Sequence, residues 1–176
     1  ARRGVEHHAG RAPQPGAWTP EHRAFLRRLG MRLSAVTECL SPDGFSLNLA
    51  AEELNGIVAD ASRFARDEGA VRGLPDWTDE AHTAIALELA AARLLASCAA
   101  PVMPRFASRL AAALGAEPPA QWPRAVAFVA PGSRIDLARQ VLFGAAPHHG
   151  PQDAERAAVQ RATATVAPML PWLRDV

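Results

Sequence analysis

A pair of prolines within an otherwise helical stretch, Leu94 to Gly115, constrains the fold more than any other feature of the sequence. Pro101 has no backbone N–H and restricts Ala100 before it, so a helix is predicted to end there. Pro104 is tolerated only in the first turn of a helix, which predicts that a second helix begins within three residues. Gly115 provides the left-handed residue with which such helices close. The stretch therefore predicts a tight helical corner.

The second arm of this corner is predicted to be buried on one side. At 100° per residue its apolar side chains fall within about 120° of one another. They are Val102, Met103, Phe106, Leu110, Ala113 and Leu114. Arg105 and Arg109 lie outside this stripe. A corner with one-sided burial indicates a helical bundle.

Two helices are predicted before the corner. Thr19-Pro20-Glu21 combines an N-cap hydroxyl, a proline at the first helical position and an acid in the first turn, so it predicts a helix start. The apolar stripe that follows extends to Leu40, and residues 41–44 read Ser-Pro-Asp-Gly, a turn. A second amphipathic helix is predicted from about Ser46 to Asp67. Both helices are expected to lie on a common core.

A third helix, Asp79 to about Ala99, is predicted with Thr78 as its cap. It should be the central helix, because apolar residues occupy nearly its whole circumference. The exceptions are Glu88 and, on nearly the opposite side, a narrow polar strip made of Asp79, His82, Thr83, Arg93 and Ser97. We expect an arginine partner for Glu88, since an unpaired buried carboxylate is costly. The predicted fold class is all-α: an antiparallel bundle of four to five helices with an extended C-terminal wrap.

The predicted domain organisation has three parts. Residues 1–18 lack periodicity and are rich in Pro and Gly, as is typical of a linker. Residues 19–145 form the bundle, and the apolar positions in 123–145 indicate that this irregular segment wraps back over it. Residues 146–176 are a tail, in which Gln152–Val166 is predicted to form a short helix that the following prolines end.

Charge and hydropathy exclude some classes of partner. The formal net charge is +1, so no whole-molecule field favours nucleic acid or an anionic membrane. All basic side chains except histidine are arginines, and we interpret this as a compositional bias. The chain has no apolar run of about 20 residues. The first ten residues lack the apolar core of a secretory signal. We expect no membrane association and a cytoplasmic location.

The residue types that bind metals do not form a convincing site. The pairs His7-His8 and His148-His149 lie in Pro/Gly-rich segments without a nearby carboxylate or thiol. Two distant cysteines, Cys39 and Cys98, cannot make a four-ligand zinc site and are expected to be buried free thiols. The sequence also contains no phosphate-binding loop, dinucleotide fingerprint, nucleophile elbow or zinc-protease motif. Neither a metal site nor a catalytic residue is predicted.

Four arginines at spacings of 4, 1 and 4 on the first helix allow two interpretations. They could follow a phosphate backbone, or they could be a solvated helix face in a protein without lysine. The residues are Arg23, Arg27, Arg28 and Arg32. The tryptophans leave a similar choice, because a tryptophan in a loop can stack on a base or fix the loop to the core. These are Trp18, Trp77, Trp122 and Trp172.

The corner resembles one in the C-terminal helical bundle of the methionyl group of class I aminoacyl-tRNA synthetases. Those bundles carry an apolar run, a Pro-x-Met-Pro turn and a helix that ends in Leu-Gly. Two flanking segments, the helix ending Ala61-Ser62-Arg63-Phe64 and the tail from Phe128 to Phe143, are similar to segments of methionyl-tRNA synthetase in the same order. The resemblance implies structural roles for five residues: Pro101, Met103, Pro104, Gly115 and Phe143.

The chain departs from the family at several positions, among them the one whose side chain stacks on the anticodon. Ser62 and Phe64 stand where the family has Asn and Tyr, and Ser133 stands where its tail has His. Ala70-Val71 occupies the place of a Pro-Trp pair whose indole stacks on the anticodon. The resemblance therefore adds Ser62 and Arg63 to the four arginines as candidate tRNA contacts, in a reader that has lost its main groups.

The resemblance implies that this bundle braces a class I catalytic domain, in the same protein or in another chain. That domain would use ATP and Mg²⁺ to activate an amino acid, and this chain would hold no cofactor itself. The departures favour a ligase repurposed for specialised metabolism, with amide or hydrazine-type bond formation, over methionine charging. The alternative is a non-catalytic module that binds tRNA or docks to a partner.

Overall fold

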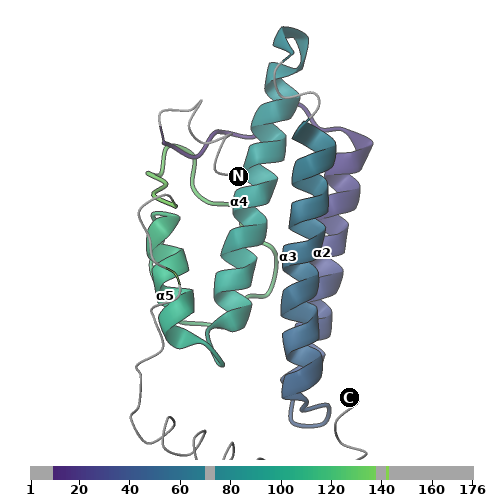
Figure 1. Ribbon diagram of the computed structural model, residues 1–176, viewed down its shortest axis with the longest axis vertical. Coiled ribbons are helices and arrows are strands. Elements are labelled where there is room, and N and C mark those ends of the chain that lie inside the picture. Colours follow the sequence, from purple (N-terminus) through teal and green to yellow (C-terminus); the bar gives the residue numbers. More distant parts are fainter. Residues whose placement is uncertain (1–9, 70–73, 138–141, 143–176) are drawn as a thin grey trace, which may run out of the picture. The chain divides into compact units, whose positions relative to one another are not determined.

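The computed structural model describes residues 10–69, 74–137 and 142. The chain divides into two compact units, 1–142 and 143–176, and all described residues belong to the first. Four α-helices and one 3-10 turn are present in this described part (Figure 1). They are α2 (Pro20–Cys39), α3 (Leu47–Gly69), η1 (Pro75–Trp77), α4 (Thr78–Ala99) and α5 (Pro104–Ala113). The described residues form no strand, apart from one isolated bridge.

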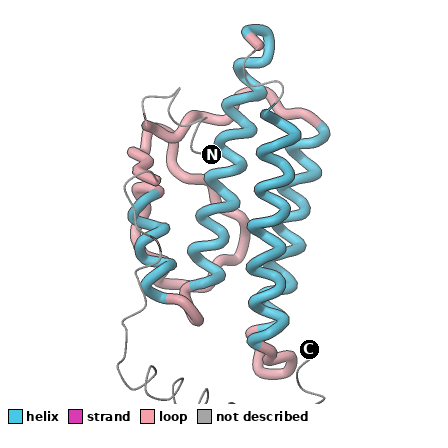
Figure 2. Tube along the Cα trace, in the orientation of Figure 1, coloured by secondary structure: helices cyan, strands magenta, loops and turns pink. Residues whose placement is uncertain are grey.

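The helices form an antiparallel bundle in which α4 is central. It packs against α2 and α3 on one side and against α5 on the other (Figure 1). Each helix also packs against the next one in the sequence, and the described loops that join α2 to α3 and α4 to α5 are drawn in pink in Figure 2. The predicted all-α bundle is confirmed.

Burial follows the predicted apolar patterns. One core cluster contains Phe25 and Leu29 of α2, Ile57 of α3 and Leu87 of α4. A second cluster lies on another face of α4 and includes Leu89, together with residues of α5 and of the segment that follows it. Most of α4 is buried, as predicted for the central helix. By length and composition it could also cross a membrane, but 72% of that window is buried inside the bundle.

The start of α2 confirms the predicted cap. The Thr19 hydroxyl accepts a hydrogen bond from the His22 backbone N–H, and Nδ1 of His22 accepts one from the Thr19 N–H. Pro20 occupies the first helical position. The start of α4 differs from the prediction, because Thr78 is already helical with φ −62° and ψ −43°. The turn η1 runs directly into α4, so Trp77 takes the cap position without a side-chain cap hydrogen bond.

The proline corner forms as predicted, with α4 ending at Ala99 and α5 beginning at Pro104. Gly115 has φ +65°. Its N–H donates to the Ala112 carbonyl, and the Ala116 N–H donates to the Ala111 carbonyl, which is the hydrogen-bond pattern of a Schellman C-cap.

Two residues of the predicted α5 stripe are exposed. Val102 is 40% exposed and Met103 is 38% exposed. They precede α5 in the turn, so helical periodicity does not set where their side chains lie. Within α5 the predicted burial of the apolar stripe is correct, because Leu110 and Ala113 are buried.

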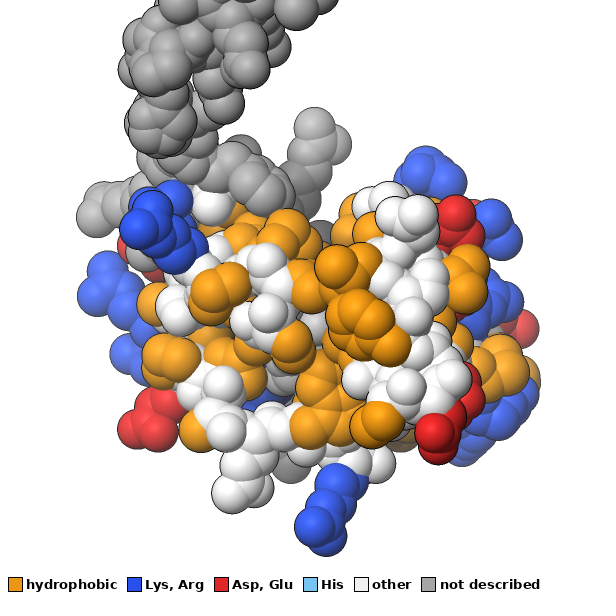
Figure 3. All heavy atoms as spheres, turned by 90° about the horizontal axis from the view of Figure 1, so that it is seen from below, with side chains coloured by type: hydrophobic (Ala, Val, Ile, Leu, Met, Phe, Trp, Pro, Cys, Tyr) orange, Lys and Arg blue, Asp and Glu red, His pale blue; other side chains and the backbone are white. Residues whose placement is uncertain are grey.

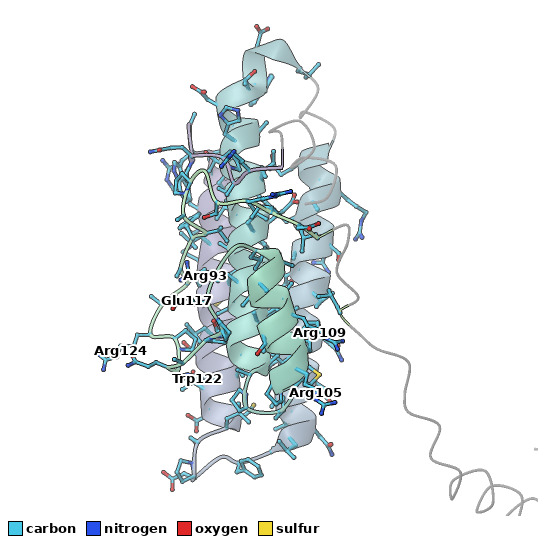
Figure 4. The ribbon with its side chains drawn as sticks, turned by 90° about the vertical axis from the view of Figure 1, so that its left-hand side faces the viewer. Arg93, Arg105, Arg109, Glu117, Trp122 and Arg124 are labelled. Carbon is cyan, nitrogen blue, oxygen red and sulfur yellow. The ribbon has the colours of Figure 1, made fainter. Side chains whose placement is uncertain are left out.

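The segment after α5 wraps over the bundle, as predicted. Trp122 Nε1 donates to Thr37 Oγ1 of α2 at 2.9 Å, and Arg93 of α4 donates to the Phe128 carbonyl. Figure 4 labels Arg93 and Trp122 on this side of the bundle. Further along, Val129 and Ile135 are buried in the second core cluster. The segment therefore spans α2, α4 and α5.

The described part of the predicted linker, residues 10–18, also contacts the bundle. Arg11 and Arg134 form an antiparallel bridge, and the Ala12 N–H donates to the Ser133 carbonyl at 2.9 Å. Ala12 is only 4% exposed, and Trp18 packs against the first core cluster. The missing periodicity thus reflects an extended conformation, and these residues are held against the wrapping segment.

Two glycines with positive φ allow a matched test of this packing. A Cβ added at Gly115 would lie 2.6 Å from the Arg134 carbonyl oxygen, whereas one added at Gly132, with φ +81°, meets nothing within 4 Å. We expect Gly132→Ala to cost about 1 to 2 kcal/mol, the penalty of the left-handed region alone. Gly115→Ala should cost distinctly more, because the wrap must also shift. Chemical unfolding of both variants measures the difference, and equal losses would contradict a tight contact.

Several predictions fall on residues outside the described ones. Phe143, the helix at 152–166, the two histidine pairs, Ala70-Val71 and Trp172 belong to this group. Glu88 is described and is 4% exposed, so the buried position assumed for it is correct. Its arginine partner stays a prediction.

Candidate nucleic-acid interface

The four arginines of α2 separate into two pairs. Arg23 and Arg27 are exposed, on the side of the helix away from the buried Phe25. Arg28 and Arg32 are partly buried and lie beside α3. A spacing of 4, 1 and 4 on a 3.6-residue helix places these pairs in different directions, so the row is not one continuous cationic stripe.

Arg32 is bound to two acids of α3. Its Nε donates to Asp60 Oδ2 at 2.9 Å and its Nη1 donates to Glu53 Oε2 at 2.8 Å. These hydrogen bonds, first that to Glu53 and then that to Asp60, raise the pKa of the guanidinium above its usual value. Gly56 allows the approach, because a Cβ there would lie 2.6 Å from Arg32 Cζ. The positive charge of Arg32 is therefore balanced by two acids within the bundle.

Arg28 shares one of these acids. Its Nη1 lies 3.8 Å from Asp60 Oδ1, and the Arg28 side chain keeps 41% of its surface exposed. Asp60 is only 5% exposed, because α2 covers the flank of α3 that carries it.

The end of α3 places the two remaining candidates, Ser62 and Arg63, on an exposed surface. Arg63 lines a hollow of about 190 Å³ between α2 and α3, opposite Arg28. Three acids line the same hollow: Glu21, Asp67 and Glu68. The structure thus brings Arg28 and Arg63 together, but within a surface of mixed charge that does not favour a polyanion.

Phe64 is a core residue. It stacks on Phe25 with ring centroids 4.0 Å apart and is 7% exposed. It also meets the edge of His22, which is fully buried and has Nε2 3.5 Å from Glu68 Oε2. Phe64, which stands where the family has Tyr, therefore fixes the end of α3 onto α2.

The comparisons with known proteins agree with this architecture. The family model described as the anticodon-binding domain of methionyl-tRNA ligase matches residues 12–161. The chain belongs to this family. No curated protein matches it in sequence.

Among solved structures, the chain is similar to methionyl-tRNA synthetase of Mycobacterium tuberculosis. For the free enzyme the TM-score is 0.68 and the sequence identity 24%, and the match covers 83% of this chain and 31% of that one. The same enzyme bound by methionyl-adenylate gives a TM-score of 0.63 at 24% identity, covering 76% of this chain and 28% of that one. The chain thus spans about a third of the length of these structures, and the likeness concerns the fold.

Within this methionyl-tRNA ligase domain the three described tryptophans differ in their surroundings. Trp18 is partly buried against Phe128, with ring centroids 6.2 Å apart, and Trp122 is held by Thr37. Trp77 is 43% exposed in η1, at the connection between α3 and α4. Two of them therefore fix loops to the core, while Trp77 presents its indole to solvent.

The described residues of the domain contain no group of three or more His, Cys, Asp or Glu side chains that could hold a metal ion. Cys98 is a buried free thiol, as predicted, and burial raises its pKa to about 12. Its thiol is protonated at neutral pH and is a poor nucleophile. Cys39 is also free but only partly buried.

Sequence reasoning missed Glu53 and Asp60, the acids that bind Arg32 and lie beside Arg28. The available signal was two acids seven residues apart with Gly56 between them, which places both on one face of α3 beside a gap for a large side chain. Nothing in the sequence states that this face meets α2 at Arg32, because that contact depends on the packing angle of two helices.

Proposed function

We propose that this domain is the structural brace of a methionyl-tRNA-synthetase-like ligase and that reading anticodon bases is not its main task. The observation that carries the proposal is the engagement of Arg32 by Glu53 and Asp60, with Arg28 also beside Asp60. Two of the four candidate arginines of α2 are thereby engaged by acids within the bundle. Strong binding of tRNA needs several unpaired cationic groups at the surface.

The catalytic partner would be a class I domain that activates an amino acid with ATP and Mg²⁺ in the cytoplasm. Repurposing for specialised metabolism, such as amide or hydrazine-type bond formation, is supported by the buried Phe64 and by the replacement of the family's Asn with Ser62. A domain that keeps its core while losing its base contacts still holds a catalytic fold in place.

An electrophoretic mobility series of the 176-residue chain with total tRNA tests the first part of this proposal. We expect no shift at physiological salt and a nearly flat dependence of affinity on salt. Each phosphate contact adds about 0.7 to 0.9 to the slope of log affinity against log salt. A slope that corresponds to several phosphates would contradict the proposal and would favour a tRNA-binding module.

Exchange of labelled pyrophosphate into ATP by the full-length protein tests the second part. We expect exchange that depends on an amino acid, without formation of methionyl-tRNA. Ordinary charging of tRNA with methionine would contradict a role in specialised metabolism. Absence of exchange with any amino acid would contradict the ligase itself.

The alternative, a non-catalytic tRNA-binding or docking module, has one specific observation in its favour. Trp77 is exposed at the α3–α4 connection, and Arg23 and Arg27 are exposed on α2. Stacking of a base on an exposed indole contributes about 1 to 3 kcal/mol. If a shift with tRNA is seen, Trp77→Ala should weaken it, whereas Trp122→Ala is the matched control at a tryptophan held against the bundle.

A further inference from the structure

A groove of about 770 Å³ runs along the side of α2. Leu26, Gly30 and Leu33 of the helix line it, and residues 122–126 of the wrapping segment form the opposite wall. The groove is distinct from the hydrophobic surface at the end of the bundle in Figure 3, because it follows the length of a helix. Ligand sites in proteins have volumes of about 300 to 1,000 Å³ and mostly apolar linings, so the groove has the size of a binding site.

The wall formed by the wrapping segment runs antiparallel to α2. Trp122 Nε1 donates to Thr37 Oγ1 near the C-terminal end of the helix, whereas the Phe128 ring meets Trp18, just before the helix begins. No backbone group of residues 117–127 has a backbone hydrogen-bond partner in the described part of the chain. Unpaired N–H and C=O groups of this kind can pair with an extended peptide.

The open space of the groove lies over Gly30. A Cβ added there meets nothing within 4 Å, and Leu26 and Leu33, one turn away on either side, provide an apolar floor. The lining residues of α2, from Leu26 to Glu38, extend over about 18 Å. An extended peptide advances about 3.3 Å per residue, so about five residues fit. Alternate side chains of such a peptide point to the same side, so apolar residues at every second position can face the floor.

The charges around the groove favour an acidic peptide. Arg124 is exposed in the segment wall, and Figure 4 shows its side chain pointing away from the bundle. With respect to the described residues, Arg124 takes part in no ion pair. Arg27 is exposed beside Leu26, and Glu38 is the acid in the lining. Two cations therefore face one carboxylate, and acidic side chains between the apolar ones of a peptide would complement them.

We propose that this groove binds an acidic, extended peptide of a partner protein, with apolar side chains at alternate positions. The apolar side chains pack on the floor, the peptide backbone pairs with residues 124–127, and the intervening carboxylates lie beside Arg27 and Arg124. The inference does not depend on the proposed function, because no catalytic domain takes part in it. Five residues bury little surface, so the interaction is of the weak, transient kind.

The pentapeptide acetyl-Val-Glu-Val-Glu-Val-amide is the probe, and amide chemical shifts of the 176-residue chain measure its binding. We expect saturable shifts that are largest at Gly30 and at residues 122–126. The control peptide acetyl-Val-Lys-Val-Lys-Val-amide should bind about tenfold more weakly, since its charges repel the two arginines. Equal affinities of the two peptides, or shifts that do not saturate, would overturn the proposal.

Backbone pairing has its own test in two methylated versions of the acidic peptide. Neighbouring residues of an extended peptide point their N–H groups to opposite sides, so only one of the two sets can face the wrapping segment. N-methylation of the valines in one peptide and of the glutamates in the other should therefore weaken binding in one case and spare it in the other. Equal effects of the two modifications would refute pairing with the segment.

Substitutions in the groove give an independent measurement. Gly30→Leu fills the open space and should weaken binding of the acidic peptide about tenfold, whereas Gly30→Ala should change it by no more than about twofold. Both variants replace a glycine inside a helix, so neither should lower the thermal midpoint. Arg124→Gln should weaken binding about threefold, and Arg105→Gln is the matched control at an exposed arginine of α5. Unchanged binding to the Gly30→Leu variant would show that the peptide lies elsewhere.

Two further results would assign the groove to another occupant and would overturn the proposal. Binding of the acidic peptide to the 176-residue chain but not to the full-length protein would place the rest of the polypeptide in the groove. Shifts of residues 122–126 on dilution of the chain without peptide would identify a second copy of the chain. Binding to both forms of the protein, without an effect of dilution, supports the peptide.

Discussion

Deletion of residues 123–145 abolishes the cooperative thermal unfolding of this domain; this is the largest effect that we expect. The described part of the segment places Val126 and Phe128 on the first core cluster and Val129 and Ile135 in the second. Full burial of such a side chain contributes about 1.5 to 3 kcal/mol, and the partly buried Val126 and Phe128 contribute less. Their sum is a large share of the total stability of a small domain, about 5 to 15 kcal/mol. Circular dichroism during heating measures the loss, and an unchanged thermal midpoint would refute the role of the wrap.

A milder variant keeps this prediction testable if the deletion prevents folding altogether. Val129→Ala with Ile135→Ala should lower the free energy of unfolding by about 4 kcal/mol, since both side chains are buried and each replacement leaves a cavity. The matched control is Ala125→Ser with Ala130→Ser, two exposed positions of the same segment. Similar losses of unfolding free energy in both double variants would show that any substitution in the segment destabilises the domain, whether or not it removes a buried side chain.

The wrap also shows where sequence-based reasoning succeeds. The predicted helix start at Thr19-Pro20 and the predicted corner from Pro101 to Gly115 are correct because their signals are local. A cap, a missing N–H and a left-handed residue each act within a few positions of the chain. The apolar residues of 123–137 indicated burial, which is also correct. Their partners could not be predicted, because Trp122 meets Thr37 across 85 positions of the chain.

The interpretations that failed depend on tertiary contacts. The pattern of α3 alone cannot show that Asp60 is buried, because its partner Arg32 comes from α2. Residues 10–12 carry no periodicity, yet they are paired with the 132–135 segment through backbone groups that any sequence provides. Val102 and Met103 fit a helical stripe in the sequence but precede the helix in the structure. In each case a neighbour that is distant in sequence, or a boundary shift of a few residues, decides the outcome.

The ion pairs of Arg32 with Glu53 and Asp60 decide how many arginines of α2 are available to a phosphate. Exposed arginines bind phosphates, but an arginine with two carboxylate partners must lose them first. Arg32 is in this position, with hydrogen bonds of 2.8 and 2.9 Å to Glu53 and Asp60. Removal of the acids should therefore convert a stabilising network into a binding site.

We expect Glu53→Gln with Asp60→Asn to raise the affinity of the chain for tRNA while lowering its stability. Released Arg32 and Arg28 could each contact a phosphate, which would steepen the salt slope by about 0.7 to 0.9 per contact. The lost charge-assisted hydrogen bonds of the partly exposed Arg32 should cost about 1 to 3 kcal/mol of unfolding free energy. Mobility shifts over a salt series and chemical unfolding measure the two effects.

The control for this double variant removes the same charge elsewhere. Asp43→Asn with Glu52→Gln neutralises two exposed acids, at the α2–α3 turn and on α3, that do not touch the arginine row. If net charge alone controlled tRNA binding, both double variants would gain affinity equally, and the interpretation of the network would be wrong. A gain confined to Glu53→Gln with Asp60→Asn would show that these two acids keep this face of the bundle from binding phosphates.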